Sequence, residues 1–432
     1  MKAGAGKAEI RIPDELFPLE KFSVVHDPLF IRVLLLEAGA SFALVSVEMT
    51  SLRDYAVEEM RNTVAELTGL TKQQIWICVT HTFSAPHTRS QNALARGGAE
   101  LRVKNQGLSN AINRALTEAL AQAKDTLQPV TVGYGIGSCQ VNVSRDVETP
   151  QGWWPGQNKQ GFSDHTLPVI RFDSIEAKKP LAILYNYDVQ SSIIDGSKLA
   201  DGTCPITGDL AGAASRFVEN AYGPDTTAIF LLGAAGDQSP REQAKRSVLT
   251  ESGDFETTDL GEQGFSLCQV LGNELGSQVV EISRQLQTRE SDAAIQFVSA
   301  SCLCPGQKIM EPRPSHPVTE YDFEPQDNRE SKAELVLLGD IALIGVKPEL
   351  SSYTAHVLRA QSSHPLTMVG TMVNGGDKYM PEASAYDRIT YEAMNSAYGK
   401  GAAEAFADCI LRHIKEQGNK IAVEKPNCET AV

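Results

Sequence analysis

Short apolar runs alternate with amphipathic segments along this chain of 432 residues, and the alternation predicts an α/β fold. The apolar runs have the length and composition of buried strands. We expect strands at 169–172, 182–185, 229–232, 335–338 and 341–344. Helices are expected at about 210–222, 263–286, 350–361 and 388–416. Strands interleaved with helices favour mixed β-sheets layered with helices over an all-α or all-β fold.

The chain opens with a predicted hairpin and a helix. Residues 33–37 and 42–47 are apolar, and the small residues between them have the spacing of a turn. Gly69 is placed to end the helix that follows. The apolar face of this helix comprises Val57, Met60, Val64 and Leu67. A second amphipathic helix is expected over 108–124.

His81 follows the apolar run 75–79 after Thr80, which predicts a buried strand with a histidine just beyond its end. A strand of β-branched and aromatic residues is rigid, so it holds such a side chain in one place. This position suits a metal ligand or a general base. A histidine at a strand end is also often a hydrogen-bonded structural residue, and the residue alone leaves both interpretations open.

The segment 133–164 is rich in Gly, Asn, Gln and Pro, and we expect it to be a long irregular loop. Long loops in compact domains are often functional, so Trp153 and Trp154 are candidates for substrate binding. Burial of the two indoles as anchors of the loop is the alternative. The charged segments near 242–262 and 305–332 are interpreted as surface insertions in a single domain spanning 1–432.

Composition restricts the partners. A net charge of −15 argues against nucleic acid or an anionic membrane surface, because phosphate groups are bound by clustered Lys and Arg. We therefore expect a small-molecule substrate, and the oligomeric state is not indicated. The start of the chain lacks the apolar region of a secretory signal, which predicts a cytoplasmic protein. Eight scattered cysteines fit reduced thiols better than a disulfide framework.

Several motifs resemble those of the neutral (non-lysosomal) ceramidase family of zinc-dependent amidases, in the order in which that family has them. Residues 80–86 (THTFSAP) are similar to its T-H-T-H-S-G/A-P signature, with Phe83 in place of the second histidine. Residues 142–145 (NVSR) resemble the element whose arginine faces the substrate, here Arg145. The further matching segments are 26–32, 207–212 and 233–240. The resemblance implies the catalytic-domain fold of that family, without its additional C-terminal domain.

The family holds zinc with two histidines, a glutamate and a tyrosine. The resemblance places His81 at the first histidine, Glu349 at the glutamate (346–350, VKPEL) and Tyr379 at the tyrosine (374–381, NGGDKYMP). Gln190 stands where the second histidine is expected. Tyr391 matches a further active-site tyrosine. The implied catalytic residues are therefore His81, Arg145, Glu349, Tyr379 and Tyr391.

Zinc with N and O ligands polarises an acyl carbonyl and supplies hydroxide at neutral pH. A carboxamide is a weaker zinc donor than imidazole, so Gln190 lowers the expected metal affinity and leaves zinc an open question. Phe83 makes the pocket drier, and Asp188, on the same strand face as Gln190, is a candidate to contact the substrate or the metal. We count Phe83, Gln190 and Asp188 with the two tryptophans as substrate-binding candidates.

The leading hypothesis is a ceramidase-like hydrolase that cleaves an amide or related acyl bond of a small soluble substrate. One alternative is a metal-free enzyme that uses the same pocket for acid–base chemistry such as isomerisation, cyclisation or elimination. A non-catalytic ligand-binding protein is another. A serine nucleophile at Ser239 is a weaker alternative, because its surroundings lack the G-x-S-x-G elbow.

Overall fold

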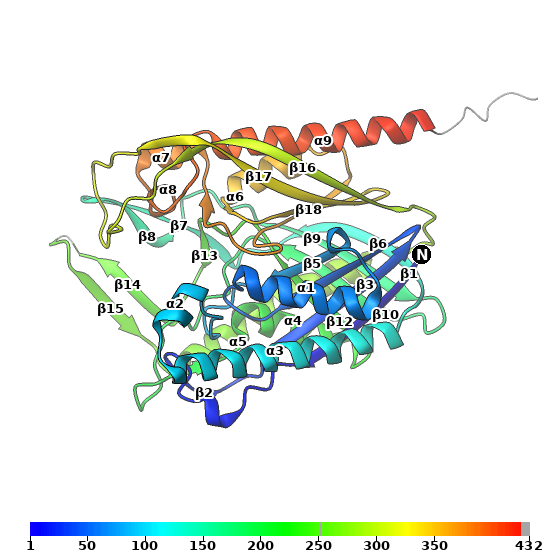
Figure 1. The fold of residues 1–432 in the computed structure, drawn as a ribbon, viewed down its shortest axis with the longest axis horizontal. Helices are drawn as coiled ribbons and strands as arrows, with labels where there is room; N and C mark the ends of the chain where they lie inside the picture. Colours follow the sequence, from blue (N-terminus) through cyan, green and yellow to red (C-terminus); the bar gives the residue numbers. More distant parts are fainter. Residues whose placement is uncertain (251, 425–432) are drawn as a thin grey trace, which may run out of the picture.

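Four layers build the fold in the computed structural model, which describes residues 1–250 and 252–424, with side chains up to residue 417. A layer of helices covers one face of an eight-stranded sheet, a four-stranded sheet packs on its other face, and further helices cover that second sheet (Figure 1). The predicted α/β class with mixed sheets is confirmed.

The eight-stranded sheet has the order β12-β10-β9-β6-β1-β3-β4-β5. Its strands are β1 (Lys2–Glu9), β3 (Phe30–Ala38), β4 (Ala40–Val47), β5 (Ile75–Val79), β6 (Gln128–Ser138), β9 (Thr166–Ser174), β10 (Pro180–Tyr187) and β12 (Thr227–Leu232). The predicted hairpin is confirmed as antiparallel β3 and β4, with Val33 opposite Val45. In β4, Val45 faces the helices while Leu44 faces the second sheet, so both sides of the strand are buried.

The helices on the first face are α1 (Asp54–Thr68), α3 (Ala99–Asp125), α4 (Asp209–Tyr222) and α5 (Gln263–Gln285). Gly69 ends α1 as predicted, because it adopts a left-handed conformation and donates its N–H to the carbonyl of Ala65. Leu67 was expected on the buried face but is 40% exposed, since it lies in the last turn beyond the sheet contact. The helix predicted over 108–124 begins earlier, at Ala99.

The second sheet has the order β16-β17-β18-β20. Its strands are β16 (Ile295–Gln307), β17 (Pro325–Leu338), β18 (Ile341–Val346) and β20 (Leu366–Gly370), and α6 (Ser352–Gln361) and α9 (Ala402–Glu424) cover it. The prediction of a single helix over 388–416 is wrong. The chain forms α7 (Ala383–Arg388), α8 (Tyr391–Met394) and α9 instead. Ile389 has a left-handed φ of 54°, and Thr390 starts α8 by accepting the N–H of Ala393.

Short sheets and helices complete the fold. They are β2 (Phe22–Val25) with β11 (Cys204–Ile206), β13 (Gln238–Pro240) with β7 (Asn142–Thr149) and β8 (Gly152–Asn158), β14 (Lys245–Leu249) with β15 (Phe255–Asp259), β19 (Glu349–Leu350) with β21 (Tyr379–Met380), α2 (Gln91–Arg96), and the 3-10 turns η1 (Asp14–Leu16) and η2 (Lys72–Gln74).

The prediction of a long irregular loop over 133–164 is wrong, because most of this segment lies in β6, β7 and β8. Gly135 and Gly137 are residues of β6 that let the end of α5 approach closely. A Cβ atom at Gly135 would lie 2.6 Å from the side chain of Leu286, and one at Gly137 would lie 2.5 Å from that of Ile282. Glycine in a strand often marks such a contact rather than a loop.

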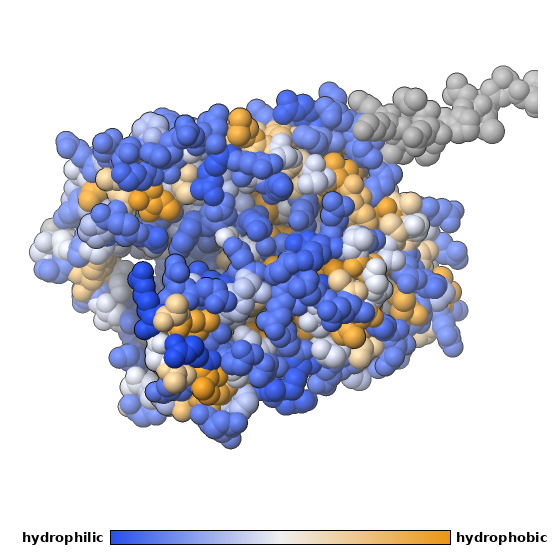
Figure 2. All heavy atoms as spheres, in the orientation of Figure 1, coloured by the Kyte–Doolittle hydropathy of each residue, from blue (hydrophilic) through white to orange (hydrophobic). Residues whose placement is uncertain are grey.

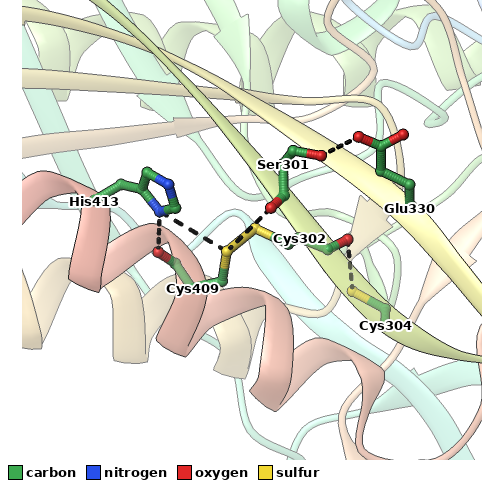
Figure 3. The surroundings of a disulfide bond; sticks show 6 residues. All are labelled: Ser301, Cys302, Cys304, Glu330, Cys409 and His413. Carbon is green, nitrogen blue, oxygen red and sulfur yellow. Dashed lines mark hydrogen bonds between the residues drawn. A yellow bond between two sulfur atoms is a disulfide. The ribbon is translucent and has the colours of Figure 1, made fainter.

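The prediction of reduced thiols is wrong for Cys302 and Cys409, which form a disulfide between β16 and α9 (Figure 3). Packing of α9 on the sheet brings their Cα atoms to 6.0 Å across a sequence separation of 107 residues, a pairing that spacing cannot reveal. The other five described cysteines are free and buried: Cys78, Cys139, Cys204, Cys268 and Cys304. Cys428 lies outside the described residues.

Hydrophilic residues cover most of the face seen in Figure 2, and its hydrophobic residues lie in scattered patches. Across the part of the chain that the structure describes, no helix combines the length and apolarity that a membrane crossing requires.

A buried charge cluster joins the first sheet to α4. Arg32 donates to Glu219 over 2.8 Å and also to Glu48, and Lys7 donates to the second oxygen of Glu219 over 2.8 Å. Buried ions need such partners, because removal of one leaves the others without compensation in a medium of low polarity. The cluster therefore fixes the position of α4 against β1 and β3.

The substitution Arg32→Ala should lower the free energy of unfolding by about 3–5 kcal/mol, because it leaves two buried carboxylates without their shared cation. Urea unfolding followed by circular dichroism measures the change. Arg11→Ala is the matched control, since the Arg11 side chain is 68% exposed and its loss should cost less than about 0.5 kcal/mol. Equal effects of the two substitutions would contradict a structural role for the cluster.

Candidate active site

The chain turns sharply at His81, just beyond the end of β5, where the residue has a left-handed φ of 55°. This conformation is uncommon for a residue with a side chain, and such strain is often found at functional positions. His81 Nδ1 lies 2.6 Å from the carbonyl oxygen of Thr50. Because a carbonyl only accepts, Nδ1 carries the hydrogen, and the lone pair of a neutral ring lies on Nε2.

Glu349 and Tyr379 are direct partners in the parallel pair β19 and β21. Glu349 Oε2 lies 3.4 Å from His81 Nε2, and neither atom has a hydrogen-bond partner among the described residues. Both atoms are buried. Two acceptors at this distance repel each other unless a proton or a metal cation lies between them, so the pair forms a site for a positive charge.

Arg145 on β7 is a buried cation at the centre of the site. Its Nε donates to Glu392 over 2.6 Å, and its Nη1 donates to the amide oxygen of Gln190 over 3.2 Å. The rings of Tyr379 and Tyr391 lie 5.3 and 5.8 Å from the guanidinium carbon. The five catalytic residues implied by the resemblance are thus close together, with Glu392 as an additional member.

Backbone hydrogen bonds connect the segments that carry these residues. A bridge joins Thr82 to Ser191, so the turn at His81 lies beside the one that carries Gln190. The N–H of Gln190 donates to Gln238 on β13, and β13 pairs with β7, which carries Arg145. The site is therefore assembled from strand ends and their short extensions.

A cavity of about 460 Å³ lies beside the site. Phe83, Arg145, Gln190 and Trp154 line it, together with residues of β14. Trp154 also contacts Tyr391 edge to face, with ring centroids 5.7 Å apart. Three of the substrate-binding candidates, namely Phe83, Gln190 and Trp154, therefore face this cavity.

The other two candidates do not line the cavity. Trp153 alternates with Trp154 along β8, and its ring packs under the guanidinium of Arg388 at 5.0 Å. Asp188 is completely buried, and Arg359 binds both of its carboxylate oxygens over 2.6 and 2.8 Å. Asp188 is thus an internal ion-pair partner and not a substrate-binding residue. The alternation of side chains along a strand, which placed Asp188 on the same face as Gln190, does not hold in the irregular segment after β10.

Phe83 screens His81 from the cavity. The two rings meet edge to face with centroids 4.6 Å apart, and Phe83 lines the cavity whereas His81 does not. The aromatic ring at this position therefore lies between the histidine and the cavity. Because Phe83 screens His81, the polar residues of the site that border the cavity are Arg145 and Gln190.

Charges in the site fix its protonation. Burial by itself raises the pKa of the Glu349 carboxyl, but positive charge on His81 and Arg145 outweighs it and holds this pKa below the usual range. Burial and the Glu349 carboxylate raise the pKa of the Tyr379 phenol against the opposing charge of Arg145. At neutral pH the site therefore contains an ionised Glu349 beside a protonated phenol.

The donor set fits a metal ion only in part. His81 Nε2 and Glu349 Oε2 are buried, unpartnered and close enough to share one cation, and Tyr379 pairs with Glu349 in the strand register. The Gln190 oxygen does not fit, because it accepts a hydrogen bond from the Arg145 cation. Within residues 1–250 and 252–424, no group of three His, Cys, Asp or Glu side chains is arranged to hold a metal.

Sequence reasoning missed Glu392 and Thr50. Glu392 directly follows Tyr391, but nothing in the local sequence indicates that its carboxylate meets Arg145, which is 247 positions away. Thr50 acts through its backbone carbonyl, so its side chain carries no signal. The contribution of β14 to the cavity was also missed, because 242–262 was interpreted only as a surface insertion.

Carboxylates collect behind Arg145. Burial and the nearby Glu392 raise the pKa of Asp146, and burial and the nearby Glu382 raise the pKa of Asp237 to about 8. Arg388 contributes a positive charge at 3.4 Å from Asp146. The cluster therefore holds a proton at neutral pH. This proton reduces the negative charge of the carboxylates, so they do not fully cancel the positive charges of Arg145 and Arg388.

The layered α/β architecture matches that of solved neutral ceramidase structures. The fold is similar to that of the neutral ceramidase from Pseudomonas aeruginosa, with a TM-score of 0.72 and 14% identity over 97% of this chain and 74% of that chain. A ceramidase complexed with C2 gives a TM-score of 0.71 and 14% identity over 100% and 76% of the two chains. No protein-family model and no curated protein matches the sequence. At this identity the likeness shows the fold alone.

Stability should fall as pH rises from about 4 to about 8, and Asp237 should contribute to this fall. Its pKa of about 8 in the folded state exceeds the value of about 3.9 expected when unfolded, so the folded state retains a proton that the unfolded state has lost. Asp237→Asn should make the dependence shallower, as measured by urea unfolding at pH 5, 6, 7 and 8. The exposed Asp225→Asn is the control. An unchanged slope in Asp237→Asn would contradict the assignment.

Proposed function

We propose that this protein is a hydrolase that cleaves an amide or related acyl bond of a small soluble molecule. The observation that supports the proposal most is the pair of unpartnered acceptors, His81 Nε2 and Glu349 Oε2, beside the buried cation of Arg145. A base next to a fixed positive charge is the combination that acyl transfer requires, because a proton is removed from water while negative charge develops on the carbonyl oxygen.

Each residue has a separate task in this proposal. The ionised carboxylate of Glu349 takes the proton of the attacking water, and His81 holds that carboxylate in place. Arg145 and the protonated phenol of Tyr379 donate to the developing oxyanion, and the free N–H of Gln190 orients the substrate carbonyl. Glu392 is a positioning residue, because it binds Arg145 and leaves the opposite edge of the guanidinium to Gln190 and the cavity.

A bound zinc ion would be held by His81, Glu349 and Tyr379, and it would polarise the carbonyl and lower the pKa of bound water to about 7. The hydrogen bond from Arg145 to Gln190 favours a second candidate, a metal-free enzyme that uses the same residues for acid–base chemistry. In that version the positive charge between His81 and Glu349 is a proton.

Glu349→Gln should lower kcat/KM by about 10²- to 10⁴-fold, the usual contribution of a general base. Release of free amine from a panel of short N-acyl amines and N-acyl amino acids measures it. The exposed Glu256→Gln, on β15, is the control and should retain full activity. Turnover that survives Glu349→Gln unchanged would remove the pocket from the mechanism.

Metal analysis of protein purified without chelator separates the two candidates. In the metal-assisted version each chain carries one zinc, which His81→Ala releases. Gln190→His should raise zinc affinity by at least about tenfold, because imidazole is a better zinc ligand than a carboxamide. Titration with a zinc-sensitive dye measures this affinity independently of turnover. Full activity of zinc-free protein would instead support the acid–base candidate.

A further inference from the structure

The cavity has a polar inner end. Gln190 is 3% exposed, and its side-chain Nε2 has no hydrogen-bond partner among the described residues although it borders the cavity. A buried donor without a partner is costly, so this N–H indicates a ligand with an acceptor at this point. A carbonyl oxygen of an amide supplies such an acceptor.

Among the described residues, one positively charged side chain at the rim of the cavity has no ion-pair partner. Arg145 is paired with Glu392, Arg246 with Glu242, and Asp195 with Lys21. Lys245, on the first residue of β14, lines the cavity and has no hydrogen-bond or ion-pair partner in the described part of the chain.

Asp259 lies opposite Lys245 in the β14 and β15 pair. Its carboxylate accepts hydrogen bonds from Ser197, Lys198 and Gly261, and against the effect of burial these bonds and the charge of Lys245 hold its pKa below the usual range. No ion pair joins the Lys245 and Asp259 side chains in the described part of the chain. A cationic rim is a local exception in a chain with a net charge of −15. The Lys245 ammonium therefore remains available to an anionic group of a ligand.

Apolar side chains also line the cavity. Val147, Trp154 and Leu249 line it, and the hairpin formed by β14 and β15 projects from the body of the protein beside β8 (Figure 1). Phe255 of the same hairpin lies 6.4 Å from Trp154, ring centroid to centroid. A cavity of about 460 Å³ lined by both polar and apolar side chains is of the size that holds one small organic molecule.

From this arrangement we infer that the substrate is a short amide with a carboxylate at one end, of the N-acyl amino acid type. The inference rests on the proposed function and names the substrate of that site. The amide carbonyl meets Gln190 and Arg145, the apolar part lies along Trp154, and the carboxylate pairs with Lys245. Lys245 is a specificity residue in this arrangement and has no part in bond cleavage.

The test compares N-hexanoylglycine with N-hexanoylglycinamide, which has the same shape without the charge. Calorimetry measures binding, and release of glycine or glycinamide measures turnover. The acid should bind at least about tenfold more tightly, and Lys245→Ala should remove this preference while leaving the binding of the glycinamide unchanged. Lys245→Arg should restore the preference, and Lys198→Ala, an exposed lysine outside the cavity lining, is the control.

The outcomes separate this inference from the proposed function. A preference for the acid that depends on Lys245, without turnover of either compound, supports the carboxylate site and contradicts the hydrolase. Turnover of both compounds with equal KM supports the hydrolase and overturns the carboxylate site. A preference that survives Lys245→Ala, or one that 0.5 M NaCl does not weaken, overturns it as well, because a rim ion pair is screened by salt.

Discussion

The buried guanidinium of Arg145 is the constraint on which the arrangement of the site depends. A cation taken out of water must be paired and hydrogen-bonded, and the partners of this one come from three separate segments. Glu392 comes from α8, Gln190 from the turn after β10, and Tyr379 and Tyr391 from the chain after β20. Satisfying one charge thus fixes the relative positions of β7, the turn after β10, β21 and α8.

The same constraint changes the chemistry of the site. The oxygen of Gln190 is engaged by Arg145, so the position that the resemblance assigns to a zinc-binding histidine contributes a free N–H to the cavity. His81 and Glu349 keep their unpartnered acceptors, but Phe83 covers the histidine. In the proposed hydrolase, catalysis therefore depends on the fixed positive charge of Arg145 and on hydrogen-bond donors, whether the charge between His81 and Glu349 is a proton or a metal.

Periodicity predicted the elements whose packing is regular. The hairpin of β3 and β4 and the end of α1 at Gly69 follow from local pattern and capping, which act over a few residues. The failures are long-range: the glycines of β6 look like a loop until α5 packs on them, and Cys302 meets Cys409 only because α9 lies on β16. Contacts between distant segments leave no periodic signal in either one.

For the site, the sequence determined which residues have the right chemistry: His81, Arg145, Glu349, Tyr379 and Tyr391 carry motifs in a recognisable order. It also showed that Gln190 and Phe83 differ from the resembled pattern. Only the tertiary structure decided how these groups interact, that Glu392 pairs with Arg145, that Asp188 is sealed in an ion pair with Arg359, and that Lys245 borders the cavity. The reason is physical, since a motif specifies side chains, whereas partners, burial and charge balance arise when distant segments meet.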